Sequence, residues 1–162
     1  EELWDSMFNL NLKAPYFLSR AVAKIMKEHG GGNIINILTM EAFIPGEGDS
    51  MYGTGKAALL ELTRIQAKEW AQFNIRVNAI APGMVKTQMS RLTWEDPEEL
   101  KRWTKHIPMT RFAEPEEVAW AALYLASEAS SYTTGACIGV DGGLLVMGSV
   151  EKVSVYKPVY TQ

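Results

Sequence analysis

Tyr52 and Lys56 are the residues of this chain whose types and spacing best suit chemistry. They lie four positions apart in the stretch MYGTGKAALL, residues 51–60. On a helix these positions share one face, so the Lys56 ammonium can approach the Tyr52 phenol. A nearby positive charge stabilises phenolate and lowers the pKa of a tyrosine, which suits a general acid or base. Chance also produces such pairs in chains of this length, so other residues must support the interpretation.

Thr39 offers a hydroxyl near the same place. It ends the apolar run NIINILT, residues 33–39, and Tyr52 follows thirteen positions later. In a doubly wound sheet, ligands bind beyond the carboxyl ends of the strands, so a hydroxyl, a phenol and an ammonium can converge there. Taken alone, Thr39 has a simpler interpretation as a strand-end residue that satisfies a local main-chain group.

Asn11 lies four positions before Pro15 in a long predicted helix. Because proline has no N–H, the Asn11 carbonyl loses its helical hydrogen bond and we expect a kink there. A free carbonyl beside an amide side chain can hold an ordered water. The alternative is a kink in a surface helix without any function.

The segment APGMVKT, residues 81–87, follows a second apolar run. Pro82 ends the run, Gly83 allows a ligand to approach the main chain closely, and Thr87 adds a hydroxyl. On its own this is a common strand-ending turn.

Helices and strands alternate along the chain and must position these residues. The predicted helices are residues 3–28, 51–73 and 115–127. The predicted strands are residues 33–39, 75–81 and 136–140. Asp49 or Ser50 is the expected N-cap of the second helix, and residues 85–113 are expected to be irregular with one short helix capped by Asp96. The pattern predicts an α/β fold, the C-terminal part of a doubly wound, Rossmann-like parallel sheet of about three strands with one open edge.

Composition excludes several classes of function. Sixteen Lys and Arg residues against nineteen Asp and Glu residues give a net charge of -3 without a basic block, so neither nucleic-acid nor membrane binding is expected. His29 and His106 stand alone, and the single Cys137 allows no internal disulfide, so no metal site is predicted. Cys137 is interpreted as a small core residue rather than a nucleophile. A cytoplasmic location is the expectation.

Five blocks, in order, together resemble the short-chain dehydrogenase/reductase family. They are NLNLKAPYFLSRAV, GGNIINILT, MYGTGKAALLELT, NIRVNAIAPGMVKT and EPEEVAWAALYLASEASSYTTGACIGVDGG. The resemblance runs from about Leu3 to Leu145 and implies an NAD(P)-dependent oxidoreductase that interconverts a secondary alcohol and a ketone.

The resemblance implies a role for each candidate catalytic residue. Tyr52 is the general acid in carbonyl reduction and the base in alcohol oxidation. Lys56 lowers the pKa of Tyr52 and holds the nicotinamide ribose hydroxyls. Thr39, where the family usually has serine, binds the substrate oxygen; its added methyl group predicts a narrower pocket. Asn11 seats a water that links Lys56 to solvent.

The resemblance also implies a cofactor and partners. The main chain around Pro82 and Gly83, with Val85 and Thr87, positions the carboxamide of NAD or NADP. The substrate is a small alcohol or carbonyl compound, and the two long helices form the interface of a homodimer or homotetramer. Residues 85–113 resemble a substrate lid. Its apolar residues suggest a moderately hydrophobic substrate, although lid packing alone would also require them: Trp94, Trp103, Ile107 and Met109.

One departure from the family concerns the cofactor. No GxxxGxG motif occurs in the chain, and such a glycine-rich turn binds the cofactor pyrophosphate. We therefore expect residues 1–145 to be a partial domain that lacks its glycine-rich half, as a fragment of a longer product rather than a natural half-domain without catalysis. Residues 146–162 are expected to form a tail, either mobile or extended across a neighbouring subunit. The alternative function is an inactive assembly module that binds no cofactor by itself.

Overall fold

The computed structural model describes residues 1–146. Its helices are α1 (Glu2–Phe8), α2 (Ala14–Glu28), α3 (Ser50–Trp70), α4 (Arg91–Trp94), α5 (Pro97–Thr104) and α6 (Pro115–Ala126). Its strands are β1 (Gly32–Ile37), β2 (Ile75–Pro82) and β3 (Cys137–Val140). The predicted tail lies outside the described residues, apart from Val146. Among residues 1–146, no helix combines the length and hydropathy that a membrane span needs.

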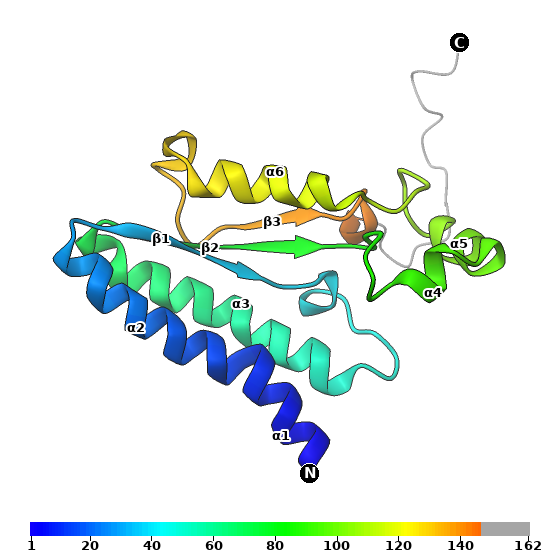
Figure 1. The fold of residues 1–162 in the computed structure, drawn as a ribbon, viewed down its shortest axis with the longest axis horizontal. Helices are drawn as coiled ribbons and strands as arrows, with labels where there is room; N and C mark the ends of the chain where they lie inside the picture. The colour runs from blue at the N-terminus through cyan, green and yellow to red at the C-terminus, as the bar shows by residue number, and fades with distance from the viewer. Residues whose placement is uncertain (147–162) are drawn as a thin grey trace, which may run out of the picture.

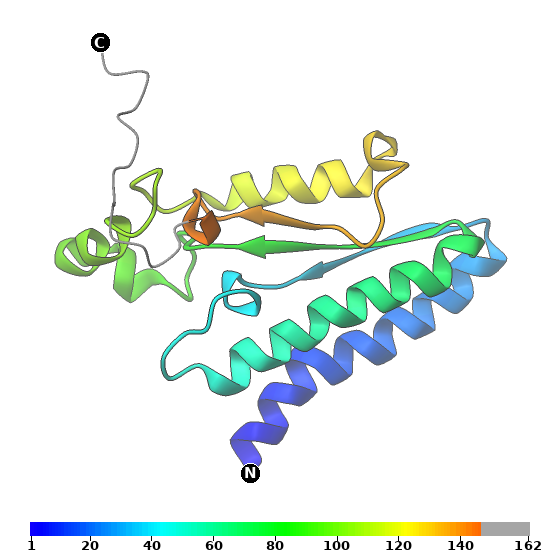
Figure 2. The same cartoon turned by 180° about the vertical axis from the view of Figure 1, so that it is seen from behind.

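The three strands form one parallel sheet in the order β1-β2-β3. The register places Ile34 of β1 beside Val77 of β2, and Ile80 of β2 beside Ile138 of β3. Helices α2 and α3 cover one face and α6 covers the other (Figures 1 and 2). The strands all end on the side where α4 and α5 lie (Figure 1). The predicted α/β architecture is confirmed.

The core joins α3 to the central strand. In β2, Val77, Ala79, Ile80 and Ala81 are completely buried, as expected for a parallel strand covered on both faces. One apolar cluster contains Leu38, Leu59, Leu60, Ala79 and Ala81. Because α3 packs directly on β2, its first turn is held near the carboxyl ends of the strands, where ligands bind in such sheets.

The first predicted helix is divided rather than merely kinked. A π-helical turn, Asn9–Lys13, separates α1 from α2, and the Ala14 N–H donates to the Asn9 carbonyl, five residues back. Pro15 lies next to this turn. Since proline cannot donate, the extra residue of a π turn gives the chain another way to continue its helical hydrogen bonds.

Other element boundaries differ by a few residues. Strand β1 ends at Ile37, two residues before its predicted end. Asp49 is the N-cap position of α3, but its side chain caps nothing, whereas Asp96 accepts the N–H groups of Glu98 and Glu99 as predicted. Helix α4 was not predicted, because four residues are too few for a hydrophobic period.

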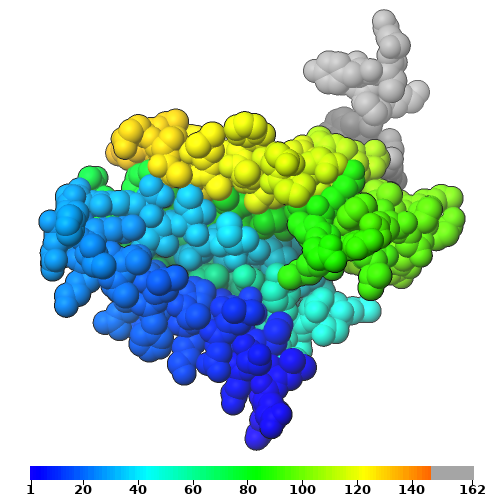
Figure 3. Space-filling view, viewed as in Figure 1, coloured from blue at the N-terminus to red at the C-terminus, as the bar shows by residue number. Residues whose placement is uncertain are grey.

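One edge of the sheet carries exposed apolar groups. Beside β1, a cavity of about 570 Å³ is lined by Leu10, Leu18 and strand residues. Leu10 is 70% exposed and Leu18 is 66% exposed. In the space-filling view, α1 projects from the body below this region (Figure 3). The predicted open edge is therefore present in the described part of the chain.

Candidate active site

Thr39 and Tyr52 meet just beyond the end of β1. Thr39 is the N-cap of a 3-10 turn, Met40–Ala42, and Tyr52 lies in the first turn of α3. Their side chains lie close enough for the Thr39 hydroxyl to lower the pKa of the Tyr52 phenol. Thr39 Oγ1 also accepts the Glu41 N–H at 3.4 Å, so the hydroxyl satisfies a local main-chain group as well as facing the phenol.

The pKa of Tyr52 lies above its ordinary value. Burial of the phenol is the largest cause, and the nearby carboxylates of Glu41 and Asp49 also raise this pKa, whereas the hydrogen bond with Thr39 lowers it. Burial and negative charge both disfavour phenolate. The family resemblance implies that Lys56 lowers this pKa, but Lys56 is not among the groups that shift it here.

The position of Lys56 explains that difference. Its Nζ donates to the Ile37 carbonyl at 2.8 Å and lies 5.8 Å from the centre of the Tyr52 ring. The lysine is on the same helix face as the tyrosine, as predicted, but the ammonium is directed to the end of β1. Burial lowers the pKa of Lys56 itself, because desolvation disfavours the charged amine.

Asn11 is buried at the π turn, next to the helix that carries Lys56. Its Nδ2 donates to the Met7 carbonyl at 3.0 Å. A Cβ atom at Gly55 would lie 3.6 Å from the Asn11 Cβ. A Cβ there would make an ordinary van der Waals contact, so the first helical segment packs against α3 one residue before Lys56.

The turn after β2 packs against the turn after β3. The Gly83 N–H donates to the Val140 carbonyl at 2.9 Å, and Pro82 is the last residue of β2. A Cβ at Gly83 would lie 2.8 Å from the Asp141 Cα. The main chain of Asp141 thus lies close to Gly83, and the approach of a ligand to Gly83 stays a prediction.

Val85 and Thr87 lie in a segment organised by Ser90. Val85 forms an isolated bridge with Ala113. The Thr87 N–H donates to Ser90 Oγ at 3.1 Å, and the Thr87 carbonyl accepts the indole N–H of Trp94 at 3.0 Å. Thr87 is exposed, so its hydroxyl is accessible at the strand-end edge.

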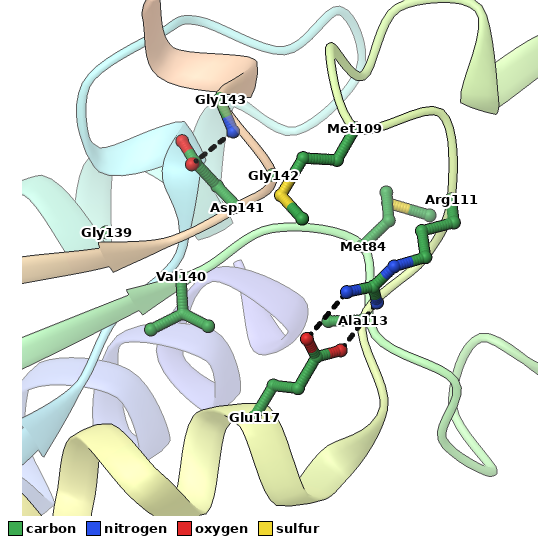
Figure 4. A pocket seen from close by; sticks show the side chains of 10 residues that line it. All are labelled: Met84, Met109, Arg111, Ala113, Glu117, Gly139, Val140, Asp141, Gly142 and Gly143. Atoms are coloured by element: carbon green, nitrogen blue, oxygen red, sulfur yellow. Dashed lines mark hydrogen bonds and ion pairs between the residues drawn. The ribbon is translucent and has the colours of Figure 1, made fainter.

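A second cavity of about 290 Å³ lies where the ends of β2 and β3 meet the start of α6. Figure 4 shows the Arg111 guanidinium paired with both oxygens of Glu117 on one side of it. On the other side, Asp141 accepts the N–H groups of Gly143 and Leu145.

The predicted lid residues divide between packing and the cavity. Ile107 is 2% exposed, and a Cβ at Gly142 would lie 2.7 Å from it, so Ile107 belongs to the core. Met109 lines the cavity and is exposed. Trp94 uses its indole to hold Thr87. The apolar character of this segment therefore partly serves packing.

Sequence reasoning missed three groups around the site. Glu41 influences Tyr52, the Ile37 carbonyl binds Lys56, and Ser90 organises the turn at Thr87. A main-chain carbonyl leaves no signal in the sequence. Glu41 is visible in the sequence as an acidic residue two positions after Thr39, but nothing there indicated that one of its carboxyl oxygens would be buried.

Comparisons with known proteins agree with this arrangement. The family model described as enoyl-(acyl carrier protein) reductase matches residues 1–145. Human dehydrogenase/reductase SDR family member 4 is 41% identical over 143 residues, which cover 88% of this chain and 51% of the relative. The chain belongs to the short-chain dehydrogenase/reductase family. The 3-oxoacyl-[acyl-carrier-protein] reductase FabG of Thermotoga maritima is 40% identical over 90% of this chain and 58% of its own length.

Solved structures of this family share the fold. A gluconate 5-dehydrogenase from Burkholderia cenocepacia, in complex with NADP and tartrate, superimposes with a TM-score of 0.87 at 30% identity, covering 91% of this chain and 58% of that chain. A short-chain alcohol dehydrogenase homologue from Sinorhizobium meliloti gives a TM-score of 0.85 at 40% identity, covering 90% of this chain and 58% of that one. The chain therefore spans little more than half the length of these relatives.

The residues present fit one end of a nicotinamide cofactor. Lys56 and Tyr52 place an amine and a hydroxyl, both hydrogen-bond donors to ribose hydroxyls, at the carboxyl edge of the sheet. The sequence has no GxxxGxG turn for the pyrophosphate. Among residues 1–146, no group of three or more His, Cys, Asp or Glu side chains could hold a metal ion.

Proposed function

We propose that this chain is the catalytic and substrate-binding portion of an NAD(P)-dependent oxidoreductase that interconverts a secondary alcohol and a ketone. The observation that carries the proposal is the pairing of Tyr52 with Thr39 beyond the end of β1, with Lys56 on the same helix face. Membership of the short-chain dehydrogenase/reductase family supports it.

In this proposal the side chains divide the proton chemistry. Bound NAD(P) supplies or accepts the hydride. Thr39 donates a hydrogen bond to the substrate oxygen, and Tyr52 protonates that oxygen as negative charge develops during reduction. Tyr52 holds its proton at neutral pH, although the raised pKa makes the phenol a weaker proton donor than a tyrosine in water. Oxidation of the alcohol requires Tyr52 to accept a proton as phenolate. The nearby carboxylates of Glu41 and Asp49 disfavour this charged form.

The remaining predicted residues have supporting roles in the proposal. Lys56 holds the nicotinamide ribose hydroxyls, and Asn11 seats a water between Lys56 and solvent. The main chain at Pro82 and Gly83, with the nearby Val85 and Thr87, positions the carboxamide. The buried position of Asn11 next to α3 supports the proposal that Asn11 seats this water. Because Gly83 packs on Asp141, we assign it to the shape of the turn.

Substitution of Tyr52 by Phe tests the proposal. The experiment measures oxidation of NADH and NADPH with a panel of ketones, using the protein as expressed from its own gene. Since Tyr52→Phe removes only the transferable proton, turnover should fall at least about 100-fold, the lower range of general acid catalysis. Tyr132→Phe is the matched control, because Tyr132 is fully exposed and lies outside the site. Near-normal turnover by Tyr52→Phe would contradict the assignment of Tyr52 as the general acid.

A second candidate function is an assembly module without catalysis, and the exposed face of α2 and α3 favours it. That face has a cavity of about 490 Å³ lined by Tyr16, Ile65, Gln66 and Trp70. Gln66 is 2% exposed and its Oε1 has no hydrogen-bond partner among the described residues. We propose that a second copy covers this face in a homodimer or homotetramer.

Titration of the 162-residue chain with NAD(H) and NADP(H) discriminates between these functions. Without a glycine-rich turn, we expect weak binding or none by the chain alone. Micromolar binding would exclude the inactive module. The cytoplasmic location, the choice between NAD and NADP and the hydrophobic character of the substrate stay predictions.

A further inference from the structure

Glu41 lies at the junction of Thr39, the start of α3 and the loop between them. Its N–H donates to Thr39 Oγ1 at 3.4 Å. A Cβ at Gly53 would lie 3.3 Å from the Glu41 carbonyl oxygen and 3.7 Å from the Glu41 Cβ. Glu41 thus contacts the Thr39 hydroxyl, which faces Tyr52, and it packs against Gly53, the residue after Tyr52.

The side chain of Glu41 continues toward the loop. A Cβ at Gly46 would lie 3.2 Å from Glu41 Oε1 and 3.6 Å from Asp49 Oδ2. Asp49 is the N-cap residue of α3, and its carbonyl accepts the Gly53 N–H at 2.9 Å. The two carboxyls therefore lie together at the beginning of the helix that carries Tyr52, beside a cavity of about 280 Å³.

One oxygen of the Glu41 carboxyl lacks a hydrogen-bond partner in the described residues. Glu41 Oε2 is buried and accepts no hydrogen bond from any donor in the described residues, which is costly for an ionised oxygen. A proton on Glu41 allows a hydrogen bond to the Asp49 carboxylate. Burial, the charge of Asp49 and this hydrogen bond all raise the pKa of Glu41. The two carboxyls therefore influence each other across the loop that leads into α3.

We propose that Glu41 is a positioning residue for the Thr39–Tyr52 pair. Its main chain holds the Thr39 hydroxyl, and its carboxyl, joined to Asp49, holds the segment that begins α3. The inference rests on the proposed function only in treating this pair as catalytic. The charged and titratable groups that face Glu41 are Asp49 from the loop and Tyr52 from α3.

The first test is a spectrophotometric titration of Tyr52 in the 162-residue chain. Tyrosinate absorbance is recorded against pH with and without the Tyr52→Phe change, and the difference isolates Tyr52. Glu41→Gln keeps the shape and removes the negative charge, so the Tyr52 titration should move to lower pH. Glu47→Gln is the matched control, because Glu47 is an exposed carboxylate of the same loop. Equal midpoints in wild type and Glu41→Gln would overturn the electrostatic role.

Hydrogen exchange tests positioning without cofactor or substrate. With Glu41→Ala, amide exchange across residues 39–54 should become several-fold faster, because the carboxyl that lies beside Gly46 and Asp49 is lost while the main-chain contacts with Thr39 and Gly53 stay. Glu47→Ala should leave this segment unchanged. Unchanged exchange with Glu41→Ala would refute the role. If Tyr52→Phe kept its turnover while both Glu41 effects appeared, the positioning role would stand and the catalytic assignment would fall.

Discussion

At the residue scale, the surroundings of a side chain decide its proton affinity more than its spacing in the sequence does. The four-residue interval between Tyr52 and Lys56 places both on one helix face, yet Lys56 Nζ donates to Ile37. The phenol is instead influenced by Glu41 and Asp49, so its pKa rises. A helical interval fixes the direction of two Cβ atoms, but the nearest acceptor fixes where a long amine ends.

Glu117 gives a prediction at this scale. Its two oxygens pair with Arg111 and it accepts the Glu114 N–H, which together lower its pKa from 4.5 to about 2. A carboxyl whose pKa is lower in the folded than in the unfolded protein stabilises the fold at pH values above its ordinary pKa. For Glu117 this stabilisation disappears as the pH falls from 4.5 toward 2.

Urea unfolding as a function of pH measures this contribution. Glu117→Gln should unfold at lower urea than wild type near neutral pH, and the two midpoints should converge as pH falls below about 4. Glu116→Gln, at an exposed neighbouring position, should stay parallel to wild type. A difference between Glu117→Gln and wild type that does not depend on pH would contradict the ion-pair origin.

At the element scale, a few buried polar side chains fix how the strands are joined. Asn78 in β2 is 1% exposed. Its Nδ2 donates to the Thr133 carbonyl at 2.8 Å, and its Oδ1 accepts the Ala136 N–H at 3.0 Å. One side chain thus holds the segment before β3 against β2, which the apolar pattern of the sequence does not encode.

Asn78→Ala should destabilise the fold strongly. It leaves the part-buried Ala136 N–H without its partner, whereas the Thr133 carbonyl still accepts from Arg76 at 3.4 Å, so a loss of about 1–3 kcal/mol is expected. Chemical denaturation measures the loss. Gln72→Ala serves as the control, because Gln72 is exposed and bonds only within its own turn. A loss for Asn78→Ala no larger than that of the control would show that water replaces the lost partners.

At the scale of the whole molecule, the chain has the carboxyl edge of a doubly wound sheet but exposes apolar groups beside β1. The strand lies at the edge of the sheet in residues 1–146, with Leu10 and Leu18 exposed next to it. Unpaired strand edges with apolar neighbours favour association.

Sedimentation of the 162-residue chain tests this property. We expect association that increases with concentration, and a Leu10→Gln/Leu18→Gln double variant should shift it to at least several-fold higher concentration. Leu92→Gln is the control, because Leu92 is 89% exposed on α4, away from β1. A monodisperse monomer would contradict the prediction.

The sequence by itself determined the order of helices and parallel strands, because hydrophobic periods and buried apolar runs are local signals. It also placed Thr39 and Tyr52 at the same edge, since parallel strands end together. Only the tertiary structure decided that Lys56 reaches a carbonyl, that Gly83 packs on Asp141 and that one carboxyl oxygen of Glu41 is buried near Tyr52. These facts depend on which distant groups become neighbours, and burial and charge act through those neighbours rather than along the chain.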